Sequence, residues 1–295
     1  MFSFCETLIQ LNLSKFDTSQ VTDMIGMFHY CKSLTKLDLS NFDTSQVTAM
    51  DKMFYGCYDL LKLNINNFDT SQVTDMCCMF SNCKSLTQLD LSSFDTSAVI
   101  SMSCMFSACE SLTQLDLSKF DTSHVIDMRK MFYGCYRLLK LNISNFDTSS
   151  VVNMLGMFSD CVSLTQLDLS SFDTSAVISM SCMFSACESL TQLDLSNFDT
   201  DIVTNMNSMF YDCKALTQLD ISNFNTHNVD DTRWMFEHCE KLTTIYISDK
   251  WKTNSVIFSS NMFGDCHSLP GFSPEKTGIE MAKPTKQEGY LTLKK

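Results

Sequence analysis

Residues 83–108, CKSLTQLDLSSFDTSAVISMSCMFSA, form one copy of a segment that recurs every 26 residues along almost the whole chain. A fixed period of this length is typical of repeat proteins, in which each copy packs against the copies before and after it. A cysteine opens each copy, at Cys5, Cys31, Cys57, Cys83, Cys109, Cys135, Cys161, Cys187, Cys213 and Cys239. The next cysteine, Cys266, lies one residue later than this spacing predicts.

The two halves of the repeat carry different hydrophobic patterns. Leu89-Asp90-Leu91 alternates apolar and polar residues, which predicts a β-strand with one buried face. Asp95-Thr96-Ser97 then supplies side-chain acceptors suited to the first turn of a helix. The second half predicts an amphipathic helix, because its apolar residues fall at helical spacing: Val99, Met102, Met105, Phe106 and Cys109. Each repeat therefore predicts strand, turn, helix and turn.

The repeated pattern L-x-L-S-x-F-D-T-S-x-V-x-x-M-x-x-M-F-x-x-C resembles the BspA-like leucine-rich repeats of many microbial surface proteins. The resemblance covers nearly all of residues 1–266, with departures at Asn225, Thr232 and Trp251. It implies an α/β leucine-rich-repeat solenoid, either a horseshoe or a right-handed coil, of about ten 26-residue strand-turn-helix units. Its parallel sheet would line the concave face and its helices the convex face. It also implies a place on a microbial or parasite surface, but no particular ligand.

Domain boundaries follow from where the repeat begins and stops. Residues 1–266 are expected to form one solenoid that opens inside a repeat, at Met1-Phe2-Ser3-Phe4-Cys5, without an N-terminal cap. Residues 267–295 are expected to form a C-terminal cap, with Ile279–Ala282 and Tyr290–Leu293 as a strand pair; a linker to a further domain is the alternative. A longer period lies over the short one, because Ser85–Ser118 is identical to Ser163–Ser196.

Composition excludes some classes of function. The net charge is −13, and an acidic protein repels the phosphates that dominate nucleic-acid affinity. No apolar run approaches the ~20 residues that span a bilayer, so no membrane insertion is expected. The chain shows no nucleotide-binding or hydrolase motif and no row of histidines, so we expect no enzymatic activity and no cofactor.

The fifteen cysteines are interpreted mainly as core residues. Ten occupy one position of the repeat, where a thiol behaves as a small hydrophobe. No C-x-x-C pair suggests zinc, and no metal site is predicted. A bridge between Cys78 and Cys104 is conceivable, but neighbouring helices usually lie too far apart for one.

The candidate ligand-binding stripe is the polar residue between the last two strand leucines. Three interpretations stay open: a solvated polar face, a ligand-binding concave sheet and a row that binds cations. The stripe comprises Asp38, Asn64, Asp90, Asp116, Asn142, Asp168, Asp194 and Asp220.

A second stripe is the threonine of each turn, such as Thr44 and Thr96, which is expected to cap the turn and to form a hydrogen-bond ladder. An exposed threonine array that orders water is the alternative.

The function expected from the sequence is that of a non-enzymatic adhesion or protein-binding module. It would be a microbial cell-surface or secreted protein that recognises a protein or glycan through the concave sheet. An intracellular protein-interaction scaffold in the cytoplasm is the alternative, favoured by the unpaired cysteines. The oligomeric state does not follow from the sequence.

Overall fold

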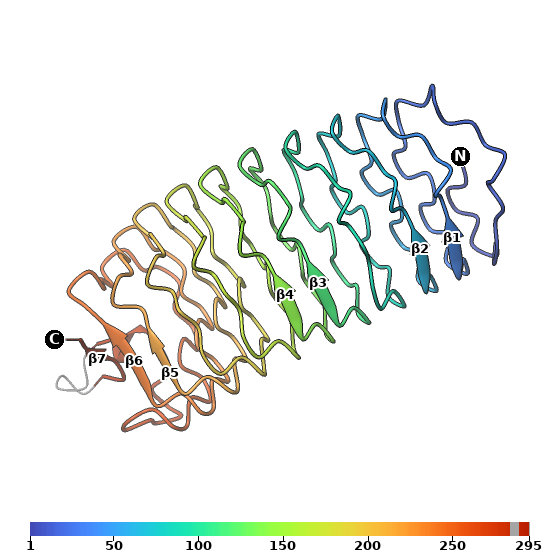
Figure 1. Ribbon diagram of the computed structural model, residues 1–295. Coiled ribbons are helices and arrows are strands. Elements are labelled where there is room, and N and C mark those ends of the chain that lie inside the picture. The colour runs from blue at the N-terminus through green and yellow to red at the C-terminus, as the bar shows by residue number, and fades with distance from the viewer. Residues whose placement is uncertain (284–288, 295) are drawn as a thin grey trace. The chain divides into compact units, whose positions relative to one another are not determined.

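The computed structural model describes residues 1–283 and 289–294, and the chain divides into two compact units, Met1–Ser150 (unit 1) and Val151–Lys295 (unit 2). Within each unit every 26-residue repeat forms one coil, and successive coils lie side by side (Figure 1). The two units are described in turn.

In unit 1 the predicted strand segments pair in parallel with a register shift of one repeat. β1 (Lys36–Asp38) pairs with β2 (Lys62–Asn64), and β3 (Gln114–Asp116) pairs with β4 (Lys140–Asn142). An isolated parallel bridge joins Gln10 to Lys36. The central leucine is buried in β1 and β3 and half-buried in β2 and β4, and the flanking residues are exposed except for the half-buried Asn64. The sequence prediction of a one-sided strand is therefore confirmed at these positions.

Unit 2 contains a three-stranded parallel sheet in the order β5-β6-β7. β5 (Gln218–Asp220) pairs with β6 (Thr244–Ile247), and β6 pairs with β7 (Thr292–Leu293). A short 3-10 helix, η1 (Ile279–Met281), precedes β7.

Charge explains part of where strands pair. β1–β2 and β3–β4 place an aspartate beside an asparagine, as in Asp38 and Asn64, and Asn64 Nδ2 donates to Asp38 Oδ1 at 3.0 Å. Neighbouring coils that would place two aspartates side by side, such as Asp168 and Asp194, form no strand pair among the described residues. Like charges directly opposite one another destabilise a sheet. The segments that contain Asn64 and Asp90 also form no strand pair with each other, and nothing in these two side chains explains it.

The second half of the repeat is not a helix, and this prediction is wrong. The part of the chain that the structure describes contains no α-helix. The N–H groups of Lys52, Phe54 and Gly56 donate to carbonyl oxygens of the next coil at 2.9 Å. An α-helix would direct each of them to the carbonyl four residues earlier in the same segment. The second half of each repeat is therefore a stack of consecutive turns, which extends the cross-coil hydrogen bonding of the strands.

Left-handed residues produce these turns. In one coil Lys52 has a φ of 55° and Gly56 a φ of 72°, and the equivalent residues of the other coils also have positive φ. Two left-handed residues four positions apart, such as Lys52 and Gly56, interrupt a right-handed helix. The second of the two positions holds glycine, asparagine or aspartate in most coils, and these residues tolerate left-handed backbone. These residues are a sequence signal for left-handed turns that the helix prediction did not use. They are Gly56, Asn82, Gly134, Asp160, Asp212 and Asp265.

A second parallel ladder runs beside the turns. Single bridges join successive coils just before the first methionine of the repeat. In unit 1 they connect Asp23, Ala49, Asp75, Ser101 and Asp127, and in unit 2 they connect Asn153, Ser179, Asn205, Asp231 and Phe258. Coils that also share a strand pair are thus joined on two sides.

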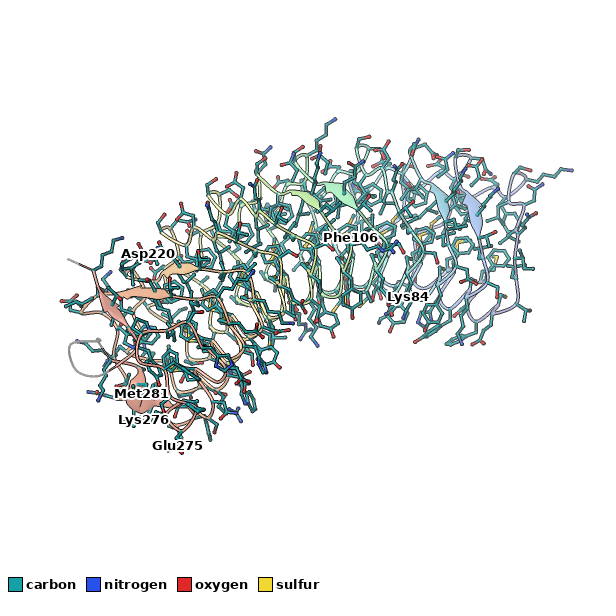
Figure 2. All side chains as sticks on the ribbon, turned by 90° about the horizontal axis from the view of Figure 1, so that it is seen from below. Lys84, Phe106, Asp220, Glu275, Lys276 and Met281 are labelled. Carbon is teal, nitrogen blue, oxygen red and sulfur yellow. The ribbon has the colours of Figure 1, made fainter. Side chains whose placement is uncertain are left out.

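The apolar residues predicted as a helical stripe are buried, although they do not form a helix. Val47, Met50, Met53, Phe54 and Cys57 are all fully buried. Phenylalanines at this position stack on those of the next coil at centroid distances of 5.5–5.8 Å from Phe28 to Phe132 in unit 1. Phe106 lies within this stack (Figure 2). The core of unit 1 is therefore a column of identical side chains in register.

In unit 2 the chain after Cys266 packs on the last coil. Tyr290 is buried and meets Phe263 edge-on at 5.4 Å, at the end of the phenylalanine stack of unit 2. Trp251 Nε1 donates to the carbonyl of Ala282 at 3.3 Å. The expected strand pair within the tail is wrong, because β7 pairs with β6 and Ile279–Met281 is a 3-10 helix. The edge of β6 would otherwise leave backbone groups unpaired.

The turn threonines form the predicted ladder and are buried rather than exposed. Thr44 Oγ1 donates to the carbonyl of Asp69 at 2.9 Å and accepts the N–H of Asp69 at 2.8 Å. The nine threonines from Thr18 to Thr226 at this position are at most 4% exposed. The water-ordering alternative is therefore wrong, since these hydroxyls already serve the next coil.

Replacing Thr44 by valine tests the ladder. Thr44→Val leaves both backbone groups of Asp69 without this partner, so we expect a loss of about 1–3 kcal/mol in the free energy of unfolding. Thr44→Ser keeps the hydroxyl and removes one methyl group, worth ~0.8 kcal/mol. Urea unfolding compares the two, and an unchanged stability in Thr44→Val would show that the hydrogen bonds contribute nothing.

Two glycines of unit 1 test the left-handed turns. Gly56 and Gly134 have φ values of 72° and 71°, but a Cβ at Gly56 would lie 2.6 Å from the Tyr30 ring, whereas one at Gly134 meets nothing closer than 3.5 Å. We expect Gly134→Ala to cost about 1–2 kcal/mol for the backbone alone. Gly56→Ala should cost a further 1–3 kcal/mol or so for the displaced ring. Chemical unfolding of both variants measures this, and unchanged stability in Gly134→Ala would refute the left-handed turn.

Candidate functional site

The candidate site is the outward side of the strand segments, which we call the strand face. It carries two rows per unit: glutamine or lysine before the central leucine, and aspartate or asparagine after it. The structure places every member of the predicted stripe in the second row. Asn64 and Asp220 are half-buried, and the others are exposed: Asp38, Asp90, Asp116, Asn142, Asp168 and Asp194.

The aspartates of this row also hold the turn that follows each strand segment. Asp168 Oδ1 accepts the N–H of Ser170 at 3.0 Å, and Asp194 Oδ1 accepts that of Ser196 at 3.0 Å. Such local bonds stabilise the turn. Hydrogen bonds from these serines hold the pKa of Asp168 and of Asp194 below the ordinary value. Both carboxylates therefore stay charged at any pH above about 4.

The strand face of unit 1 mixes both signs of charge. A hollow of about 420 Å³ lies over its first coils, lined by the outward residues and central leucines of three neighbouring segments. Lys36 and Lys62 stand beside Asp38 and Asn64 there. This part of the face offers ammonium, amide and carboxylate groups within one surface.

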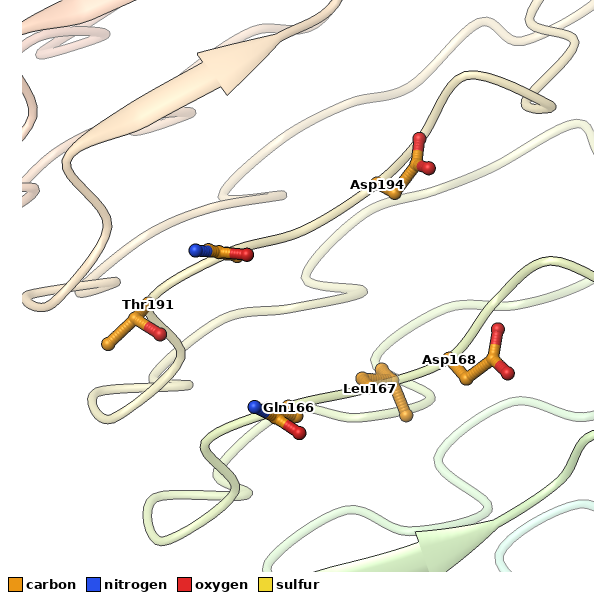
Figure 3. Close-up of a pocket in the computed structure, with 6 residues that line it drawn as sticks. Gln166, Leu167, Asp168, Thr191 and Asp194 are labelled. Carbon is orange, nitrogen blue, oxygen red and sulfur yellow. The ribbon is translucent and has the colours of Figure 1, made fainter.

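The strand face of unit 2 is negative where it is hollowed. A hollow of about 320 Å³ is lined by two adjacent coils. Figure 3 shows the carboxylates of Asp168 and Asp194 on neighbouring segments, both directed to the same side. The glutamine row, represented by Gln166, contributes only neutral amides to this hollow. The site therefore presents two carboxylates and amide groups without a lining cation.

The third aspartate of unit 2 has a different environment. Asp220, at the end of β5 (Figure 2), forms an ion pair with Lys294 Nζ, from the residue that follows β7. Sequence reasoning missed this contact, because Lys294 lies outside the repeat and nothing in the period predicts its position. Asp220 does not line the hollow, whose two carboxylates are those of Asp168 and Asp194.

The repeated cysteines do not belong to the strand face. Their thiols donate to the phenylalanine carbonyl of the preceding coil, as from Cys57 to Phe28 at 3.2 Å. Burial raises the pKa of Cys135, Cys187 and Cys239 to about 12, so these thiols stay protonated. All fifteen cysteines are free.

The cation-binding interpretation gains no support from the geometry. Within residues 1–283 and 289–294, no three His, Cys, Asp or Glu side chains gather in an arrangement suited to a metal ion. The aspartates of the stripe stand in single file, one to a coil. Over the same described residues, no helix has the length and hydrophobicity that crossing a membrane requires.

Comparison with known proteins was made at the level of family and of structure. Solved structures similar to this chain include a leucine-rich repeat protein from Bacteroides ovatus, with 17% identity over 81% of this chain and 78% of that chain and a TM-score of 0.30. A leucine-rich cell surface protein from Faecalibacterium prausnitzii is 16% identical over 82% and 80%, with a TM-score of 0.34. A Leptospira interrogans leucine-rich repeat protein is 15% identical over 83% and 66%, with a TM-score of 0.33.

No curated protein matches the chain. A family model does match, in overlapping segments at residues 1–63, 34–115, 57–166, 111–194 and 192–272. These segments cover the whole repeat region and carry the 26-residue unit that builds both stacks of coils. The chain therefore belongs to the family described as Mycoplasma protein of unknown function, DUF285.

Proposed function

We propose that the chain is a non-enzymatic binding module that recognises protein partners through the strand face. The observation that carries this proposal is the pair of exposed polar rows, which repeats from coil to coil and is hollowed in both units. Long repeated surfaces of this kind suit extended ligands that make many weak contacts. The core beneath is filled by apolar side chains, so the polar groups that could contact a partner lie on the surface.

The charge of unit 2 indicates the kind of partner. Asp168 and Asp194 are exposed, ionised and without a lining cation, while Gln166 offers hydrogen-bond donors and acceptors. Electrostatic complementarity favours partners of the opposite sign. We infer that this part of the strand face takes a lysine- or arginine-rich segment of a protein.

Neutralising the two carboxylates tests this inference. Asp168→Asn together with Asp194→Asn keeps the side-chain acceptor for the turn, as Asn142 does for Ser144 in its own coil. Each exposed charge pair contributes about 0.2–1 kcal/mol. We therefore expect a short lysine-rich peptide to bind the double variant roughly 2- to 30-fold more weakly, measured by fluorescence anisotropy.

The matched control removes the same charge elsewhere in unit 2. Glu240 and Glu275 are both exposed and neither lines the hollow, so Glu240→Gln with Glu275→Gln should leave binding unchanged. Equal weakening in both double variants would mean that only net charge matters. Binding of neutral oligosaccharides in place of the peptide would favour a glycan ligand over a protein.

We further propose a cell-surface or secreted location and an adhesive role. This proposal is supported by the resemblance of the repeat to BspA-like leucine-rich repeats. The alternative, an intracellular interaction scaffold, is favoured by the fifteen free cysteines, because reducing compartments keep thiols unpaired.

Protease treatment of intact source cells separates the two locations. A surface protein should be degraded within the time that leaves a cytoplasmic marker protein intact, because the protease does not enter the cell. Protection of the chain in intact cells, with digestion only after lysis, would establish the intracellular alternative.

A further inference from the structure

Three half-buried cysteines gather on two adjacent coils of unit 1, outside the buried cysteine column. Cys77 Sγ lies 3.5 Å from Cys78 Sγ. Cys78 and Cys104 occupy the same position of consecutive repeats, and both have a φ of 56°. All three thiols are free. None of them serves the strand face, so their function is a separate question from the proposed binding.

Cys78 and Cys104 lie in turns rather than in helices, which changes whether they can be joined. Their backbones run in parallel, because a bridge links Asp75 to Ser101 and the N–H of Cys78 donates to the carbonyl of Ser103 at 2.8 Å. Coils hydrogen-bonded in this way lie about 4.8 Å apart, like the strands of a sheet. A disulfide requires Cα atoms about 4.4–6.8 Å apart. The objection from helix spacing therefore does not apply.

The surroundings of Cys104 favour its thiolate. A hydrogen bond from the Cys78 thiol lowers the pKa of Cys104 to about 6, with further help from Ser103 and from the nearby charges of Lys130 and Arg129. Arg129 Nε donates to Ser103 Oγ at 3.2 Å, which holds this cationic side chain beside the cysteine. A thiolate is the nucleophile in thiol–disulfide exchange.

We propose that Cys78 and Cys104 form a redox site that closes a disulfide between adjacent coils by exchange with a low-molecular-weight disulfide. The Cys104 thiolate attacks one sulfur of the small disulfide, forms a mixed disulfide and releases one small thiolate. Cys78 then loses its proton to solvent and attacks Cys104 Sγ, which forms the Cys78–Cys104 bond and releases the second small thiolate. The two cysteines together lose two electrons, and the small disulfide gains them.

The second step is open to Cys78 once the first has occurred. In the reduced protein its hydrogen bond to Cys104 raises the pKa of Cys78. The mixed disulfide removes the negative charge that this hydrogen bond stabilises. Cys78 is then a neighbouring thiol in register with the sulfur that it attacks.

The chain carries an internal control for this chemistry. Cys182 lies in the 34-residue stretch identical to that around Cys104, with the same φ of 56° and a serine hydroxyl 3.5 Å from its sulfur. In the coils on either side of it, the equivalent residues are Gly156 and Ser208. Cys182 therefore shares the surrounding sequence and the backbone conformation of Cys104 but has no thiol in either adjacent coil to close a disulfide, and Asn207 and Ser208 stand where Cys104 has Arg129 and Lys130.

The test incubates the full chain with glutathione disulfide at neutral pH, blocks the remaining thiols by alkylation and maps the products by mass spectrometry. We expect a peptide cross-linked through Cys78 and Cys104, and no intrachain disulfide at Cys182. Cys104→Ser and Cys78→Ser should each abolish the cross-link, and Cys182→Ser should leave it unchanged. A Cys77–Cys78 disulfide in its place, or equal glutathionylation of Cys104 and Cys182 without a cross-link, would overturn the proposal.

The pH dependence of alkylation gives a second readout that does not depend on cross-linking. In the native chain Cys104 should be alkylated with a half-maximal rate near pH 6, the value set by its hydrogen bond to Cys78. Cys78→Ala should move this midpoint to higher pH, because alanine removes the hydrogen bond that stabilises the Cys104 thiolate. The same midpoint in both proteins would show that Cys78 does not stabilise the Cys104 thiolate.

Discussion

The structure depends on one constraint: in each coil, alternate backbone N–H groups donate to the coil that follows. Phe54 donates to Met79, and Phe80 donates to Met105, at 2.9 Å in both cases. Buried backbone donors need partners, and here the partners lie in a neighbouring copy of the same sequence. A coil is therefore complete only when another coil lies beside it, and the 26-residue period is the condition that brings donors and acceptors into register.

The side-chain patterns follow from that register. Identical residues meet identical residues, so phenylalanines stack on phenylalanines, and buried cysteines such as Cys83 donate to the preceding coil. The buried turn threonines serve the same purpose, since each hydroxyl satisfies backbone groups of the next turn. On the outward side the same register aligns carboxylates. This repulsion is relieved where an asparagine or a lysine intervenes, as at Asn64 and Lys294.

The sequence predicted the period, the buried positions and the threonine ladder, because each depends on local pattern and on register. Its strand prediction is confirmed in only some repeats, and Leu89-Asp90-Leu91 is not a strand. It failed on the helix, since offsets of three, six, seven and ten suit both a helical stripe and a series of tight turns. Burial of Val47, Met50 and Phe54 is common to both structures. The distinguishing signal was the glycine, asparagine or aspartate near the end of the repeat. The ion pair of Lys294 with Asp220 was beyond prediction, because it joins residues 74 apart without a shared pattern.

The account is tested most directly by NMR detection of scalar couplings across hydrogen bonds to the amide nitrogen of Phe54. If coils share their backbone hydrogen bonds, this nitrogen couples to the carbonyl carbon of Met79 in the next coil. A coupling to the carbonyl carbon of Met50, four residues earlier as in an α-helix, would contradict the account.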